Sequence, residues 1–172
     1  MKKKKPHDKL RHKNKIRKNQ TAALQKDDRI RDDSLDKMER RISEMTGVEH
    51  KIIRDKSFAS MSEALIEFAQ PLLDVIDLRD REAYEKAVLT AICFWNCAVM
   101  QQEPGNDRKI KKLLKPFMKD ADGKAIATHM LDRKRLLFPD LNRYIVNYEL
   151  VDQGDDYHLS VASTFGDFSP CQ

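Results

Sequence analysis

The sequence lacks the cysteine pattern of secreted, disulfide-bonded domains. It contains three cysteines, an odd number; Cys93 and Cys97 fall inside one apolar segment, and Cys171 stands alone near the end. Unpaired cysteines are among the most buried residue types, so we interpret the pair as reduced structural thiols in a cytoplasmic protein. Zinc would need a second pair of ligands at a characteristic spacing, and none is present. We therefore predict no metal site.

Motifs that carry chemistry are also missing. With only five glycines, the chain has no Gly-rich loop for phosphates or dinucleotides, and it has no nucleophile elbow. The sequence therefore predicts no cofactor and no catalytic residue. A non-enzymatic role is the first hypothesis.

No apolar run reaches the ~20 residues that a bilayer-spanning helix needs. The longest, Ala87 to Met100, has fourteen residues, of which only Thr90 and Asn96 are clearly polar. No apolar run follows Lys5 either, so we predict neither a secretory signal peptide nor a membrane partner.

What the sequence does contain is a central apolar helix. The run from Ala87 to Met100 is rich in helix-forming residues, and charged residues from Arg79 to Lys86 lead into it, which predicts a helix over about 79–102. A helix that is apolar on nearly every side must be surrounded by protein. We expect the other elements to pack around it.

Three further helices are predicted by apolar residues at helical spacing. One begins at the capping box Ser60-Met-Ser-Glu63 and should kink or break at Pro71. The second begins at Asn106 or Asp107, with Ile110, Leu113, Leu114, Phe117 and Met118 inward, and the third covers Ala125 to Leu137, with Ile126, Met130 and Leu137 inward.

The last forty residues change to the alternating pattern of strands. Two such runs, residues 144–151 and 157–162, flank a turn that contains Gly154, which predicts a hairpin with one face on the helices. The expected fold class is α+β: a mostly helical bundle around the central helix at about 79–102, with a C-terminal two-stranded antiparallel β-hairpin.

Charge divides the chain into an arm and a body. Residues 1–20 hold ten cationic residues and one acid and carry +9, so residues 21–172 carry −4. We predict a disordered basic arm over 1–20, because it has few apolar residues to bury. After the arm we predict a charged amphipathic helix over 21–47, a globular α+β domain over 57–165 and a tail over 166–172.

The basic arm is the strongest functional signal. Clustered lysine and arginine attract nucleic-acid phosphates through counterion release, so we hypothesise non-specific contact with RNA or DNA, for example on a ribonucleoprotein. The acid-free run from Arg108 to Lys119 and the cluster Arg133–Arg135 would extend this surface. A solvated tail is the alternative interpretation, and in a eukaryote the basic blocks would also suit nuclear import. The residues assigned to nucleic-acid binding are Lys2, Lys3, Lys4, Lys5, Arg11, Lys13, Lys15, Arg17, Lys18, Lys109 and Lys112.

Protein binding is a second hypothesis. Leu35, Met38, Ile42 and Met45 form one narrow apolar stripe on the charged helix. The stripe spans less than two heptads, so we favour docking on the domain's own surface over a homodimer. An exposed hairpin edge is the other surface that would take a protein partner.

A third hypothesis is a small hydrolase-like site at the hairpin, where Ser160, Ser163, His158, Glu149 and Asp156 gather. It requires a concave pocket beside His158 and Glu149. Asn96 is polar within the apolar helix, and we interpret it as an amide that ties a neighbouring loop or helix end to the core.

Three segments carry a resemblance: Ser62-Glu-Ala-Leu-Ile-Glu-Phe-Ala-Gln-Pro-Leu-Leu73, Phe94-Trp-Asn96, and Arg133-Lys-Arg-Leu-Leu-Phe-Pro139 before the hairpin. Together, over about residues 60–165, they resemble a group of small uncharacterised bacterial proteins. Some related chains carry a C-terminal zinc motif of the SEC-C type. Here Ser169-Pro-Cys-Gln172 is at most a remnant, because the Cys-x-Cys and Cys-Cys elements are missing. The resemblance implies no catalytic residue.

Overall fold

The computed structural model describes residues 29, 30, 32–53, 61–154 and 156–164. They form a helix over residues 32–46, called the charged helix below, followed by α2 (Met61–Leu73), α3 (Arg81–Met100), α4 (Asp107–Leu114), the 3₁₀ helix η1 (Lys115–Met118), α5 (Ala121–Leu137), β1 (Ile145–Asp152) and β2 (Tyr157–Ser163). The predicted α+β class is confirmed. The predicted arm and tail, and the cap residue Ser60, lie outside the described residues.

Helix α3 is the centre of the fold, as the sequence predicts. Its first turn is capped by Asp80, whose carboxylate accepts hydrogen bonds from the backbone of Glu82 and Ala83 at 3.0 and 3.2 Å. α3 packs against α2, α4, α5 and β1, and the Trp95 ring meets Phe68 edge to face at 5.3 Å. In the part of the chain that the structure describes, no helix is long and apolar enough to cross a membrane.

Helix α2 continues through Pro71, so of the two predicted outcomes, a kink or a break, the break is wrong. Pro71 has no N–H to offer the carbonyl of Glu67. The guanidinium of Arg133 on α5 donates to that carbonyl at 2.9 Å and to the carbonyl of Phe68 at 3.2 Å. The helix ends two residues later, at Leu73. A side chain from another helix therefore satisfies the backbone group that proline leaves without a partner.

Helix α5 begins four residues earlier than predicted. Asp120 caps it by accepting a hydrogen bond from Gly123 N–H at 2.7 Å. Gly123 itself lies against η1, where a Cβ atom would come within 2.3 Å of the Phe117 carbonyl oxygen. This close approach requires glycine, and it lets the first turn of α5 pack on η1.

The buried face of α5 also differs from the prediction. Ile126 and Leu137 are exposed rather than inward, and the buried positions are Ala127, Met130, Leu131 and Lys134. Lys134 is 0 % exposed. Its ammonium donates to the Phe138 carbonyl at 2.8 Å and lies 4.7 Å from the centre of the Trp95 ring. The helix turns this face inward because the cation finds both partners inside the core.

In α4 and η1, Ile110 and Leu114 are buried and Phe117 packs on the core, as predicted, with its ring 4.6 Å from that of Phe94. Leu113 and Met118 were predicted inward and are exposed. Pro116 lies in η1, where the α-helix tightens to the 3₁₀ form.

The hairpin is held to α3 by two consecutive side chains. Trp95 Nε1 donates to the Arg143 carbonyl at 2.8 Å. The amide of Asn96 donates to the Ile145 carbonyl and accepts from the Ile145 N–H, both at 2.9 Å. Asn96 is thus a tie to the core, as predicted, but its partner is the first residue of β1 rather than a loop or a helix end. Strands β1 and β2 pair antiparallel, and the turn between them uses Gly154 at φ +96°.

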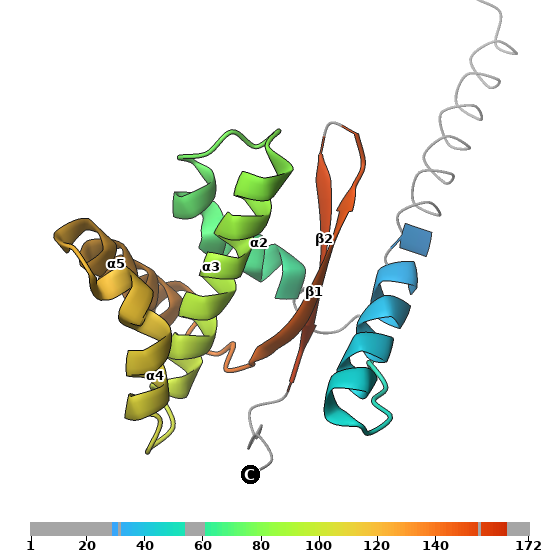
Figure 1. The fold of residues 1–172 in the computed structure, drawn as a ribbon, viewed down its shortest axis with the longest axis horizontal. Coiled ribbons are helices and arrows are strands. Elements are labelled where there is room, and N and C mark those ends of the chain that lie inside the picture. Colours follow the sequence, from blue (N-terminus) through green and yellow to red (C-terminus); the bar gives the residue numbers. More distant parts are fainter. Residues whose placement is uncertain (1–28, 31, 54–60, 155, 165–172) are drawn as a thin grey trace, which may run out of the picture.

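Helices cover both faces of the hairpin. Figure 1 places α2 to α5 on one side of it and the charged helix on the other. Leu150 and Leu159 are buried in the main core. Ser160 and Ala162, on the alternate positions of β2, are buried as well, and Ala162 lies outside that core. The charged helix ends as predicted at Gly47, which has φ +69° and donates to the Ser43 carbonyl at 2.9 Å.

Candidate nucleic-acid interface

The basic face of α4 and η1 is the clearest candidate site in the described structure. We define it by six cationic residues that are all exposed: Arg108, Lys109, Lys111, Lys112, Lys115 and Lys119. Because Ile110 and Leu114 turn toward the core, the remaining positions of the helix face water. The local sequence therefore presents six cations on the outer side of the element, where Leu113 and Met118 are also exposed.

No acid interrupts this surface. Residues 108–119 carry +6, whereas residues 21–172 as a whole carry −4, so the rest of the body carries −10. Among the described residues, none of the six cations has an acidic side chain within ion-pair distance. Lys111 and Lys112 also lie in the last turn of α4, where the helix dipole favours cations. The face is a concentrated, uncompensated positive surface.

Lys109 and Lys112, assigned from the sequence, lie on this face. Arg108, Lys111, Lys115 and Lys119 complete it, and the signal for them was the acid-free run itself. The other assigned residues lie outside the described part of the chain: Lys2, Lys3, Lys4, Lys5, Arg11, Lys13, Lys15, Arg17 and Lys18. The described chain starts on the charged helix, which Figure 1 places across the hairpin from α4.

The cluster Arg133–Arg135 does not extend the basic face. Arg133 donates hydrogen bonds to backbone carbonyls of α2, and Lys134 is fully buried. Arg135 forms an ion pair with Asp132, one turn earlier on α5. Burial lowers the pKa of Lys134. These cations stabilise the fold, and the sequence expectation that they add to the surface is not met.

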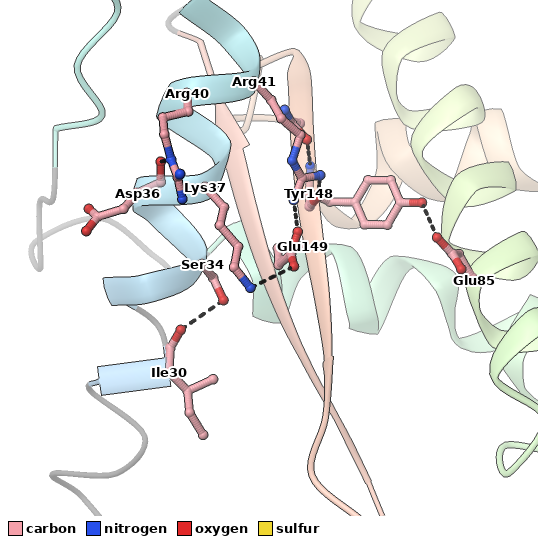
Figure 2. A network of polar contacts seen from close by, with 10 residues as sticks. Ile30, Ser34, Asp36, Lys37, Arg40, Arg41, Glu85, Tyr148 and Glu149 are labelled. Carbon is pink, nitrogen blue, oxygen red and sulfur yellow. Dashed lines mark hydrogen bonds and ion pairs between the residues drawn. The ribbon is translucent and has the colours of Figure 1, made fainter.

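The predicted hydrolase residues lie at a structural junction. Figure 2 shows the Glu149 carboxylate on β1 facing Lys37 and Arg41 of the charged helix, and it forms ion pairs with both. Its side chain is only 17 % exposed. Ser160 lies opposite on β2 and is buried, and its hydroxyl has no hydrogen-bond partner among the described residues. A paired, covered carboxylate and a buried hydroxyl do not form an accessible catalytic pair.

On the other face of the same strand, the Tyr148 hydroxyl donates to Glu85 of α3 at 3.1 Å (Figure 2). Burial and this hydrogen bond raise the pKa of Tyr148 to about 12. The Arg41 guanidinium also donates to the Tyr148 carbonyl at 3.4 Å. Adjacent residues of β1 thus connect to helices on opposite faces of the hairpin.

The apolar stripe of the charged helix, Leu35, Met38, Ile42 and Met45, is partly covered where this helix packs on the hairpin. Met38 is fully buried, Leu35 and Ile42 are partly buried, and Met45 is 71 % exposed. The part of the stripe nearest the hairpin is therefore occupied within the chain. Only its last residue lies free on the surface.

A hollow of about 500 Å³ lies between the charged helix and the segment after it, and is lined by Asp36, Glu39, Lys51, Ile52 and Ile53. The Glu39 carboxylate already accepts the Ile52 N–H at 2.6 Å. His158 and Glu149 do not line this hollow, so it is not the pocket that the hydrolase hypothesis requires.

In the described ranges, no three His, Cys, Asp or Glu side chains come together as a metal site. Comparisons of the chain with protein-family models, with curated proteins and with solved structures find no match. The candidate interface therefore rests on the chemistry of its own residues.

Proposed function

We propose that this chain is a non-enzymatic, intracellular protein that binds RNA or DNA through phosphate contacts, using its basic arm and the basic face of α4 and η1. The observation that carries the proposal is the segregation of charge: +9 in residues 1–20 and +6 in residues 108–119, against −10 in the rest of the chain. A ribonucleoprotein in the cytoplasm is the setting that we favour, since three cysteines without a disulfide pattern suit a reducing compartment.

Phosphate contact without base reading is the mode that these residues favour. Base stacking on single strands needs exposed aromatic rings. The arm has none, and Phe117 beneath the basic face packs against Phe94. An anionic membrane is a poorer partner, because Ile110 and Leu114 are buried in the core, which leaves only Leu113 and Met118 as exposed large apolar side chains of α4 and η1 for insertion between lipids.

The test is the salt dependence of binding, measured by fluorescence anisotropy with labelled RNA and DNA of mixed sequence. If half of the ten arm cations contact phosphates, the slope of log K against log[salt] is about −4 to −5 for the arm alone. Deleting residues 1–20 removes this part. The double variant Lys109→Gln/Lys112→Gln makes the slope of the full chain shallower by about 2, since each lost contact contributes about 0.9.

A matched control separates local contacts from net charge. Lys51→Gln/Lys86→Gln also removes two exposed lysines, one beside the hollow and one on α3 paired with Glu82. We expect this control to keep the slope of the unmodified chain. Equal slopes for the full and the truncated chain would show that the arm does not contact the nucleic acid. Equal effects of the two double variants would show that the basic face does not contact it.

We propose protein binding as the alternative function, through the charged helix or an edge of the hairpin. The observation that favours it is the exposed apolar surface where the charged helix ends: Met45 at 71 %, Val48 at 60 % and Ile53 at 80 % exposure. Sedimentation tests self-association through this surface: a concentration-dependent dimer that Met45→Glu abolishes supports it, and a monomer at all concentrations contradicts it.

A further inference from the structure

The basic face of α4 and η1 lies on the outside of a rigid element. Ile110 and Leu114 are buried in the core, and the Phe117 ring packs 4.6 Å from that of Phe94 on α3. Figure 1 shows α4 on the side of α3 that is away from the hairpin. The six cations are exposed around this anchored side. Their backbone positions are therefore fixed before any ligand binds.

The row of cations also has a defined length. From Arg108 to Lys119 the chain rises by about 20 Å, at about 1.5 Å per residue in α4 and about 2.0 Å in η1. Asp107 precedes the row and Asp120 follows it, and both are exposed. Because acids at both ends repel phosphates, contact should be confined to this length, which corresponds to about six base pairs of a duplex.

Unpaired bases find no stacking surface beside these cations. Proteins that bind single strands without sequence preference stack the bases on aromatic rings in a cationic groove. Among the residues that the structure describes, no aromatic side chain is exposed. Two partly exposed tyrosines have hydroxyl partners: Tyr148 donates to Glu85 at 3.1 Å and Tyr157 to the Arg79 carbonyl at 3.2 Å. The hollow beside the charged helix is lined by none of the six cations.

The type of cation favours a double helix as well. Five of the six cations are lysines. Arginine stacks on bases, whereas the lysine ammonium is a point charge that contacts phosphate without stacking. On a double helix the phosphates of both strands lie outside, at about one charge per 1.7 Å of axis. A rigid row of lysines matches this surface better than it matches a flexible single strand.

We propose that the basic face binds the sugar–phosphate backbone of a double-stranded nucleic acid and contributes little to the binding of single strands. This inference rests on the proposed function and specifies its ligand. RNA and DNA duplexes share the phosphate chemistry that the face contacts. The arm is separate from the face and contacts the phosphates of duplexes and single strands alike.

The test is fluorescence anisotropy of the full-length protein with RNA and DNA of one sequence, each as a single strand and as a duplex. With a duplex, Lys109→Gln/Lys112→Gln should make the slope of log K against log[salt] shallower by about 1.8, since each lost contact contributes about 0.9. With a single strand, the change should stay below about 0.5, whereas two lost contacts would give about 1.4. Lys51→Gln/Lys86→Gln is the matched control and keeps every slope.

A change of about 1.4 with single strands would overturn the proposal and leave the proposed function intact, because the face would then contact either form. An unchanged slope with both duplexes would also overturn it, since the face would not touch them. Absence of binding to all four probes at low salt would instead exclude the proposed function. The duplex, RNA or DNA, with the larger change is the one that fits the face better. Circular dichroism verifies that each variant is folded.

Discussion

At the scale of single residues, polar side chains inside the core determine how distant segments meet. Asn96 and Trp95 bond to backbone groups about fifty positions later in the chain, and Arg133 bonds to α2 at a separation of 65 and 66 positions. Each of these side chains satisfies backbone groups that would otherwise lose water without a replacement. Their removal therefore costs more than an average hydrogen bond.

The Asn96 side chain joins α3 to the start of β1. Asn96→Ala removes both hydrogen bonds to Ile145 and leaves its N–H and carbonyl without partners, so we expect a loss of about 2–4 kcal/mol in the free energy of unfolding by urea. Asn106→Ala, which removes bonds to Glu103 and Met100 in a loop, is the control and should cost well under half as much. Equal losses would contradict the role of Asn96.

A pH dependence is expected at Cys93. Because the Cys97 thiol donates to the Cys93 thiolate, alkylation of Cys93 by iodoacetamide should rise with pH around a midpoint of about 7. In Cys97→Ala the donor is gone, so the midpoint moves up toward the ordinary value of about 8.5. Mass spectrometry of the modified peptide measures both rates, and an unchanged midpoint would show that Cys97 does not act on Cys93.

At the scale of elements, α2 depends on α5 for its integrity at Pro71. Arg133→Leu removes the donor to the Glu67 and Phe68 carbonyls, and we expect a loss of about 1–3 kcal/mol in unfolding free energy. The neighbouring variant Arg135→Leu removes only an exposed ion pair with Asp132 and should cost about 0.5 kcal/mol or less. A reversed order would exclude this role for Arg133.

The charged helix is held by one buried methionine and by ion pairs with Glu149. Partly exposed ion pairs contribute about 1 kcal/mol or less, whereas truncation of a buried methionine costs about 2–5 kcal/mol. Met38→Ala should therefore speed amide hydrogen exchange of residues 32–46 by about 30-fold or more, with little change in α3. Met45→Ala, at an exposed position, is the control. A larger effect from Glu149→Gln would reverse this ranking.

At the scale of the whole molecule, charge is segregated rather than balanced. A chain without residues 1–20 carries −4, yet it keeps the +6 run of the basic face. We expect this acidic chain to be retained by a heparin column at low salt, because local and not net charge contacts the resin. Lys109→Gln/Lys112→Gln in the same background should elute earlier than Lys51→Gln/Lys86→Gln. Elution of the truncated chain in the void volume would contradict a cationic face.

Much of this architecture follows from periodicity in the sequence. Helical spacing predicts α2, α3 and α4, and alternation predicts β1 and β2, because these patterns reflect which side is buried. The buried face of α5 was predicted correctly only at Met130. Lys134 occupies a core position, and its partners, the Trp95 ring and the Phe138 carbonyl, are known only once the helices are assembled. The start of α5 was predicted four residues too late, at Ala125, whereas Asp120 caps the helix and α5 begins at Ala121.

The candidate interface was visible in the sequence only in part. The acid-free run from Arg108 to Lys119 is a local pattern, so it could be found without the fold. The contact of Arg133 with α2 is tertiary, so the sequence alone could not show that Arg133 is lost from the cationic surface. The ion pair of Arg135 with Asp132 is local, at a spacing of three, and could have been found in the sequence. Whether a cationic side chain lies on the surface or in the core depends on its contacts in the folded protein, and its charge alone does not determine this.

The pair of hydrogen bonds between Asn96 and Ile145 also has a consequence for aggregation. A two-stranded sheet has two open edges, and open edges are templates on which other chains add strands. By donating to and accepting from one residue of β1, the Asn96 amide takes the place of a neighbouring strand at that point, and Arg41 occupies the carbonyl of Tyr148 further along. Side chains thereby block the edge of β1 at Ile145 and at the Tyr148 carbonyl, and replacing Asn96 should expose Ile145 to pairing with another chain.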